Sequence, residues 1–353
     1  MKPQLSILTL AFFCFLLVQG GWNGLSAEEG EKKFTPPPTD FHTHLRSPVA
    51  TEQFQKILKL FGENLAPRDY MVCTADKLIG VLDAAGIEKA AVLSVAYIFS
   101  MPDLEIEEEL QKVQAENDWV AGQVALYPKR LIGFCGVNPL KDYAVNEIAR
   151  CAKNPNFKGI KLHFSNSKVN LTDADHIDRL KKVFFAANSA GFSIVIHMRT
   201  RNPDYGFQEA QTFIKEVIPS APDVTIQIAH MAGWGGYDPP TDKAMEAFVQ
   251  AVKAETLDQR VYFDISYTIP LSSNKWVQGE NSMSTEDTEK WQAEAGERLV
   301  RRIHQIGINH FLFGTDWMQQ EPSEYLKILH ERMEIKPAEL NDLLMNSAPF
   351  INK

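Results

Sequence analysis

Cysteine is scarce in this chain of 353 residues, which contains four. Cys14 lies in an N-terminal apolar run that we expect to be removed, which leaves Cys73, Cys135 and Cys151. An odd number without CxxC spacing argues against a disulfide framework. Export would allow one disulfide, but the sequence does not identify its pair. Cys135 lies in a strand-like run, where we expect an ordinary core residue.

An excess of positive charge is also missing. The chain has 36 Lys and Arg residues against 45 Asp and Glu residues, for a net charge of -9. No basic stripe with interleaved aromatic residues occurs, so we expect no nucleic-acid partner. The hydrophobic content of 44% and the charged content of 23% are typical of a globular protein. The length suits one large barrel or two ordinary domains.

The apolar run at residues 5–18 is too short to span a bilayer comfortably and suits the core of a signal peptide. Leu25-Ser26-Ala27 is a tolerable cleavage site. We therefore expect residues 1–27 to be a signal peptide and the protein to be exported, to the periplasm or beyond. A retained membrane anchor is the alternative. Residues 28–38, charged and then Pro-rich, are expected to be a flexible lead-in to a domain at 39–353.

A Gly-rich phosphate-binding turn does not follow the first strand-like run, which argues against an open doubly wound sheet. From residue 38 onward, strand-like and helical patterns alternate. The expected strands are 38–45, 89–98, 131–137, 157–164, 192–197, 224–230, 261–266 and 310–316. The expected helices are 51–61, 74–85, 104–126, 143–152, 175–190, 207–217, 241–255, 285–306, 323–333 and 337–345. This alternation predicts parallel strands, right-handed crossovers and one α/β domain, a closed (β/α)8 TIM barrel.

Histidine is infrequent as well, with nine residues, yet five of them stand at the ends of expected strands. His42 and His44 are two apart in the first strand, which places both side chains on one face as half of a metal site. A surface His-x-His pair is the alternative. In a barrel the strand ends meet at one mouth. The other polar residues at strand ends are Lys161, His163, His197, His230 and Asp316.

The motifs DFHTH, GIKLH, IVIH, IAHMAGWGG and FLFGTDW stand at these strand ends in this order. From about residue 39 to the C-terminus, the chain resembles the amidohydrolase superfamily, specifically its amidohydrolase-related (amidohydrolase 2) branch of metal-dependent TIM-barrel hydrolases and decarboxylases. The resemblance implies that Asp316 is both a metal ligand and the base that takes a proton from a metal-activated water. It implies that His230 ligates a second metal or polarises the substrate. The full implied ligand set is His42, His44, His197 and Asp316.

Lys161 has two interpretations. In binuclear members of the superfamily a lysine of the fourth strand is carboxylated and bridges two metals. The amidohydrolase-related branch more often holds one metal, and we favour substrate contact or a nearby charge for Lys161. His163 shares its face and is a second substrate-contact candidate, although many relatives have Pro where this chain has Phe164.

Four further residues near strand ends are candidates for the substrate pocket. Arg199 would grip a substrate carboxylate, with an ordinary loop arginine as the alternative. Trp234, Tyr267 and Trp317 would form pocket walls, with packing roles as the alternative.

We therefore expect an exported, metal-dependent hydrolase that acts on a C–N or C–O bond of a small molecule, such as an amide, lactone or ester. A metal-dependent decarboxylase is the alternative, and a non-catalytic metal-binding barrel is less favoured because no expected ligand is missing. Zinc is the expected metal from the ligand types, with manganese and iron left open. After signal cleavage we expect no membrane association, and a homo-oligomer stays open.

Overall fold

The computed structural model describes residues 35–269 and 285–352. The predicted signal peptide and residues 28–34 of the predicted lead-in lie outside these ranges. Pro37 is buried, so the last part of the lead-in packs against the barrel. Within the described ranges, no helix combines the length and the apolar character that crossing a bilayer requires.

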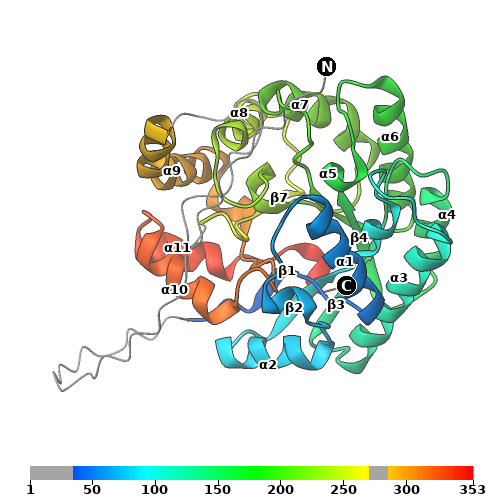
Figure 1. Ribbon diagram of the computed structural model, residues 1–353. Coiled ribbons are helices and arrows are strands. Elements are labelled where there is room, and N and C mark those ends of the chain that lie inside the picture. Colours follow the sequence, from blue (N-terminus) through cyan, green and yellow to red (C-terminus); the bar gives the residue numbers. More distant parts are fainter. Residues whose placement is uncertain (1–34, 270–284, 353) are drawn as a thin grey trace, which may run out of the picture. The chain divides into compact units, whose positions relative to one another are not determined.

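Eight parallel strands form one barrel surrounded by helices, which confirms the predicted (β/α)8 fold (Figure 1). Each strand pairs with the next one in the chain, from β1 to β8. The barrel closes where the Phe41 amide donates to the Phe313 carbonyl at 2.9 Å and where Thr43 bridges Trp317. All strand ends therefore face one mouth. The strands are β1 (Thr39–Thr43), β2 (Lys89–Leu93), β3 (Leu131–Gly136), β4 (Phe157–His163), β5 (Ser193–His197), β6 (Ile226–Ile228), β7 (Val261–Asp264) and β8 (Phe311–Leu312).

The helices begin and end at residues that suit helix termini. The Ser47 side chain accepts a hydrogen bond from the Ala50 amide at the start of α1, and Asp173 caps α6 in the same way. Gly86 ends α2 with a φ of 72°, a left-handed conformation that glycine adopts without a steric penalty. The helices are α1 (Pro48–Leu60), α2 (Ala75–Ala85), α3 (Glu109–Leu126), α4 (Ala144–Cys151), α5 (Phe164–Ser167), α6 (Ala174–Ser189), α7 (Phe207–Thr212), α8 (Pro239–Lys253), α9 (Thr285–Ile306), α10 (Pro322–Arg332) and α11 (Pro337–Met345).

Several strands are shorter than the sequence predicts. The run at 89–98 forms a strand only to Leu93, and Ala96–Ser100 is a buried 3-10 turn. The predicted strand 310–316 is reduced to Phe311–Leu312. A continuous apolar run marks burial but does not distinguish a buried strand from the buried turn that follows it. The helix predicted from residue 104 begins only at Glu109.

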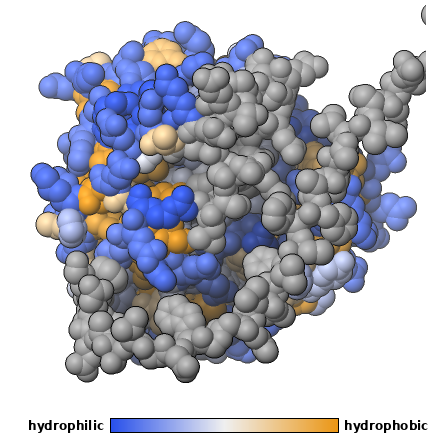
Figure 2. Space-filling model, turned by 60° about the vertical axis from the view of Figure 1, so that its left-hand side comes forward, coloured by the Kyte–Doolittle hydropathy of each residue, from blue (hydrophilic) through white to orange (hydrophobic). Residues whose placement is uncertain are grey.

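The interior of the barrel is filled by apolar side chains from opposite strands. Phe350, from the C-terminal segment, makes edge contacts with Phe41 and Phe134 at centroid distances of 5.7 and 5.1 Å. Gly159 is required by this packing, because a Cβ there would overlap the Phe134 ring and the Ser193 carbonyl oxygen. On the face shown in Figure 2, hydrophilic residues cover most of the described surface, with hydrophobic residues in small patches between them.

Cys135 and Cys151 form a disulfide that joins β3 to α4. The expectation that Cys135 is an ordinary core residue is therefore wrong. The two residues are 16 apart in the chain, and the pairing depends on the packing of α4 against the barrel, which spacing alone does not reveal. Cys73 is buried and free.

Candidate metal centre

Three of the four predicted ligands meet at the mouth of the barrel. The Nε2 atoms of His42 and His44 are 3.2 Å apart. Asp316 Oδ1 lies 3.2 Å from His44 Nε2 and 3.5 Å from His42 Nε2. The period of two in β1 therefore placed both imidazoles on one face, as the sequence predicts. The set His42, His44 and Asp316 has its ligand atoms within 4.8 Å of one another.

The partners of the Nδ1 atoms determine where each of these two imidazoles carries its ring proton. His42 Nδ1 faces Asp264 Oδ2 at 3.1 Å, and His44 Nδ1 faces the Leu93 carbonyl at 2.7 Å. Both partners are acceptors, so we assign the ring proton to Nδ1 in each case. With its proton on Nδ1, each ring in the neutral form presents an Nε2 lone pair to the other ring and to the Asp316 carboxylate. Such a group of acceptors around one point fits a divalent cation.

Burial and neighbouring charge keep these ligands in the forms that bind metals. Burial, together with the charge of Lys161, lowers the pKa of His42 to about 3, so this ring is neutral. Burial alone would raise the pKa of Asp316. The contact with His44, and then those with the other histidines around it, outweigh burial and hold that pKa well below its usual range. Asp316 is therefore an ionised carboxylate.

His197, the fourth predicted ligand, lies at the end of β5, and its ring meets the His230 ring edge to face with centroids 5.2 Å apart. It is not in any described set whose ligand atoms all lie within 4.8 Å. Its buried Nε2 has no hydrogen-bond partner, which is costly for a polar atom unless a ligand satisfies it. Burial lowers its pKa well below the ordinary value, so the ring is neutral. His197 thus fits a metal ligand chemically.

His163 stacks on His197 with ring centroids 3.9 Å apart. Its Nδ1 accepts a hydrogen bond from the Asn166 amide at 3.2 Å, so the proton of the neutral ring is on Nε2. Burial lowers the pKa of His163 well below its ordinary value, which keeps the ring neutral. This tautomer is opposite to that of His42 and His44, and it makes His163 a hydrogen-bond donor rather than an Nε2 ligand.

Lys161 is buried inside the barrel, and its Nζ lies 3.3 Å from His42 Nε2. Burial lowers its pKa to about 8, although the charges of Asp264 and Asp316 act in the opposite direction. The side chain therefore reaches the candidate metal centre from β4, as its spacing from His163 predicts. At this position it can donate to an anionic oxygen of a substrate.

His230 follows β6 in a turn and lies beside His42, with ring centroids 4.8 Å apart. Its Nδ1 donates to the Ser266 carbonyl at 2.7 Å, which in the neutral form of the ring leaves the lone pair on Nε2. His230 has a φ of 53°, and Asp316 has a φ of 56°. Such left-handed backbone is uncommon for residues other than glycine and is concentrated at functional sites. The described non-glycine residues with positive φ at this mouth are His230, Met231, Ala232, Tyr267 and Asp316.

Asp264 and Ser266, at the end of β7, are polar residues of the site that the sequence analysis did not select. Asp264 is fully buried and contacts both His42 and His230. Burial alone would raise its pKa, but His42, whose Nδ1–H donates to it at 3.1 Å, holds that pKa well below its usual range. The rule that selected Asp316, an acid at a strand end, also applied to Asp264 and could have found it.

The candidates for the substrate pocket differ in their exposure and in their contacts. Arg199 Nη1 pairs with Asp238 at 3.1 Å, and its guanidinium lies over the Tyr205 ring, so both contacts hold it in the loop. Trp234 is 38% exposed and meets the His197 ring edge to face, in the position of a pocket wall. Trp317 is 2% exposed and packs in the core, which agrees with the packing alternative for this residue.

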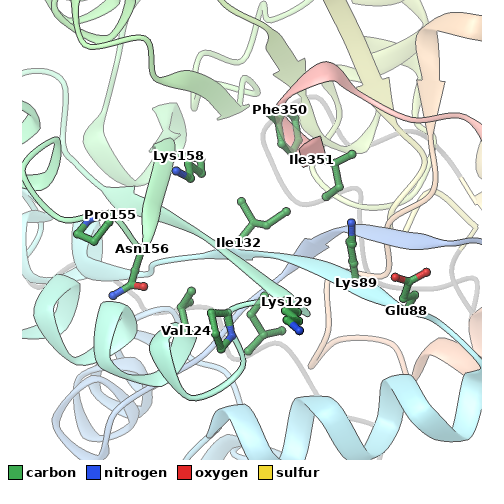
Figure 3. Close-up of a pocket in the computed structure, with 12 residues that line it drawn as sticks. Glu88, Lys89, Val124, Lys129, Ile132, Pro155, Asn156, Lys158, Phe350 and Ile351 are labelled. Atoms are coloured by element: carbon green, nitrogen blue, oxygen red, sulfur yellow. The ribbon is translucent and has the colours of Figure 1, made fainter. Parts of the chain in front are cut away.

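A cavity of about 740 Å³ lies at the opposite end of the barrel. It is formed where strands begin, with Lys89, Ile132 and Lys158 on its lining. Figure 3 shows Ile132 between Phe350 and Ile351 on one side and Val124 and Lys129 on the other. None of its lining residues belongs to the candidate metal centre. We therefore do not place the active site in this cavity, because the active sites of TIM barrels lie at the C-terminal ends of the strands.

A barrel whose strand ends bring histidines and an aspartate together belongs to the class of TIM-barrel enzymes with the active site at the mouth. Residues 80–346 match the sequence model of a family described as Amidohydrolase. This match covers most of the chain, so the protein belongs to that family and to the amidohydrolase superfamily, as its motifs indicate. Among curated proteins no sequence matches the chain.

Solved structures with the same fold include enzymes of two reaction types. The 5-carboxyvanillate decarboxylase of Sphingomonas paucimobilis has a TM-score of 0.59 and 12% identity, with 88% of this chain and 96% of that chain covered. A manganese complex of the Novosphingobium aromaticivorans 5-carboxyvanillate decarboxylase has a TM-score of 0.55 and 16% identity, with 88% and 94% covered. A probable 2-pyrone-4,6-dicarboxylic acid hydrolase of Acinetobacter baumannii has a TM-score of 0.52 and 14% identity, with 88% and 96% covered. These similarities establish the shared fold.

Proposed function

We propose that the protein is a divalent-metal-dependent hydrolase that cleaves a C–N or C–O bond of a small molecule, such as an amide, a lactone or an ester. His42, His44, His197 and Asp316 would hold the metal. The observation that carries this proposal is the group of acceptors around one point, with Nε2 atoms 3.2 Å apart and an ionised carboxylate beside them. Several solved structures with this fold contain manganese, and the ligand types suit zinc, so both metals belong in the tests.

When bound, a divalent metal supplies Lewis-acid activation of water and of the scissile carbonyl. Asp316 is the base: its carboxylate accepts a proton as water attacks the carbonyl carbon. It then returns that proton to the leaving nitrogen or oxygen as the C–N or C–O bond breaks. General acid–base catalysis of this kind contributes about 10²- to 10⁴-fold to a rate.

The residues around Asp316 bind and orient the substrate. Lys161 and the Nε2–H of His163 are donors from β4 that can hold an anionic or carbonyl oxygen. His230 presents its Nε2 from the other side of the site, where it polarises the substrate or assists proton transfer. Trp234 contributes an aromatic wall next to His197. Each of these roles is separable by a single substitution.

A decarboxylase is the second candidate, and one observation favours it. Lys161 and His163 form a donor pair that a substrate carboxylate would fit as well as a carbonyl. The observation against it is Arg199, which is held by Asp238 and does not offer a free guanidinium for a substrate carboxylate. Asp316 beside the imidazoles also supplies the base that hydrolysis needs. The balance therefore favours hydrolysis.

The experiment that separates the two reactions is a substrate screen with zinc- or manganese-loaded protein. The panel contains esters, lactones, amides and aromatic carboxylic acids, and both new carboxylic acid and released CO₂ are measured. The hydrolase proposal expects new acid without CO₂ and a loss of turnover in Asp316→Asn. Release of CO₂ from an aromatic acid, with no cleavage of esters, lactones or amides, would replace it with the decarboxylase.

The number of metals per chain tests the role of Lys161. If Lys161 stays an amine, one open site is left beside His42, and we expect about one divalent metal per chain. A carboxylated Lys161 would instead give two metals and a second-metal occupancy that rises with added bicarbonate. Measuring metal content with and without bicarbonate distinguishes these outcomes.

Export is also part of the proposal, since a signal-peptide-like segment precedes the barrel. N-terminal sequencing of protein from outside the cytoplasm should begin near Glu28. Intact Met1 on membrane-bound protein would support the retained anchor.

A further inference from the structure

The end of β7 holds two histidines, one from β1 and one from the turn that follows β6. Asp264 Oδ2 faces His42 Nδ1 at 3.1 Å and accepts from Gln227 Nε2 at 2.7 Å. Asp264 Oδ1 accepts from the His230 amide at 3.0 Å, from the Ser266 amide at 3.2 Å and from the Ser266 hydroxyl. One buried carboxylate thus accepts five hydrogen bonds. Two of them come from residues of the proposed active site.

Ser266 completes the arrangement. Its only hydroxyl proton goes to Asp264, so the lone pairs of Oγ face the two imidazoles. Oγ lies 3.1 Å from His42 Nδ1 and 2.9 Å from His230 Nδ1. The Ser266 carbonyl oxygen accepts from the same His230 nitrogen at 2.7 Å. Both Nδ1 atoms are therefore surrounded by acceptors.

We propose that Asp264 and Ser266 are positioning residues that fix the tautomers of His42 and His230 together, so that both rings present an unprotonated Nε2 to the reaction site. Asp264 also holds the His230 amide, which anchors the left-handed backbone of the turn after β6. This inference rests on the proposed function for its link to metal binding, although the tautomers themselves are a property of the protein alone.

The alternative is a purely structural role, in which Asp264 only ties β1, β6 and β7 together. The two roles predict different results when Asp264 becomes Asn. The amide keeps one acceptor oxygen but places an NH₂ group against donors, either His42 with Gln227 or His230 with Ser266. If Asp264 sets the His42 tautomer, the ring proton moves from Nδ1 to Nε2 and blocks the ligand atom. If it is only structural, the folded variant keeps both tautomers.

The test compares three variants with the wild-type protein. They are Asp264→Asn, Ser266→Ala and, as a matched control, Asp242→Asn, which changes another buried aspartate that pairs with Arg302 away from the site. Thermal unfolding first establishes which variants fold. Zinc affinity is then measured by competition with a chromophoric chelator. Histidine tautomers are read from ¹⁵N NMR of the metal-free, histidine-labelled protein.

We expect Asp264→Asn to weaken zinc binding about 10- to 100-fold, the usual effect of losing a partner that orients a metal ligand. We expect the Nδ1–H signal of His42 to disappear in the same variant. Ser266→Ala should alter the His230 signal and weaken zinc binding less, because Asp264 still holds His42. Asp242→Asn should change neither property. If Asp264→Asn does not fold, the ¹⁵N spectrum of the metal-free wild-type protein decides the matter, because an Nε2–H signal for His42 or His230 would overturn the proposal.

Folded Asp264→Asn with wild-type zinc affinity and unchanged tautomers would overturn the positioning role. A wild-type protein that binds no zinc or manganese would instead defeat the proposed function. In that case the ¹⁵N signals of the metal-free variants would still test whether Asp264 and Ser266 set the tautomers.

Discussion

The two ends of the barrel are built from the same eight strands but differ in chemistry. At the mouth, strand ends carry buried polar side chains, and residues such as His230 and Asp316 have left-handed backbone. At the opposite end, called the floor here, Phe350 and Ile351 pack against interior side chains such as Phe41. Lysines such as Lys89 and Lys158 line the cavity beside them.

The floor and the mouth of the barrel contribute differently to stability and to function. Floor side chains bury apolar surface, which stabilises the fold in proportion to area. Mouth side chains bury charged and polar groups, which is unfavourable unless partners or a bound cation compensate. The hydrogen bonds at Asp264 compensate the cost of burying its carboxylate. The buried Nε2 of His197 has no protein partner, so the cost of burying this atom is not compensated by the protein. Substitutions at the two ends should therefore have separable effects.

Asp316→Asn at the mouth should have the largest effect. We expect turnover of the substrate found in the screen to fall about 10²- to 10⁴-fold, because the general base is removed. The fold should be retained, as judged by circular dichroism. His304→Ala is the matched control, because this exposed histidine lies far from the mouth and pairs with Glu339. Unchanged turnover in Asp316→Asn would remove Asp316 from the mechanism.

Phe350→Ala at the floor should have the next largest effect, on stability alone. Removing a fully packed Phe side chain costs about 3–5 kcal/mol of unfolding free energy. Denaturant unfolding should show this loss, and zinc affinity of the folded fraction should stay near the wild-type value. A variant that loses zinc affinity without losing stability would contradict the separation of the two ends.

Glu116 tests the cost of burying an acid near the mouth but outside the metal centre. It accepts hydrogen bonds from the Ser47 amide and hydroxyl, and burial raises its pKa from 4.5 to about 7. A raised folded-state pKa means that its contribution is fully present below pH 4.5 and is lost as the pH rises through 7. The loss approaches about 3 kcal/mol. Glu116→Gln mimics the protonated form and should match the wild type at pH 4.5 but be more stable at pH 8. Equal stability of the two proteins at both pH values would refute the raised pKa.

Lys158→Ala at the floor should have the smallest effect. The side chain lines the cavity without a described ion pair, so stability should change by less than about 0.5 kcal/mol. Turnover and metal content should equal those of the wild type. A large loss of turnover would place function at the floor and contradict the separation of the two ends.

The sequence predicted most of the barrel and the centre of the site, for a physical reason. Strand–helix alternation determines the topology, and the period of two in a strand determines that His42 and His44 share a face, as do Lys161 and His163. These are local patterns, and the rule that strand ends gather at one mouth brings them together. His197 and Asp316 were found by the same rule.

The remainder depends on contacts that local patterns do not contain. The sequence left two roles open for Arg199, and its ion pair with Asp238 joins residues that are 39 apart in the chain. The Cys135–Cys151 disulfide depends on how α4 packs against β3. The roles of Asp264 and Ser266 require β7 to lie beside His42 and His230, and the tautomers follow from those contacts alone.

The most direct test of the proposed metal centre is the metal content of purified protein after saturation with zinc and removal of excess metal. The proposed metal centre predicts about one divalent metal per wild-type chain and per His304→Ala chain, and nearly none in His42→Ala or His44→Ala. Full metal content in both of the latter variants, or none in the wild type, would contradict it.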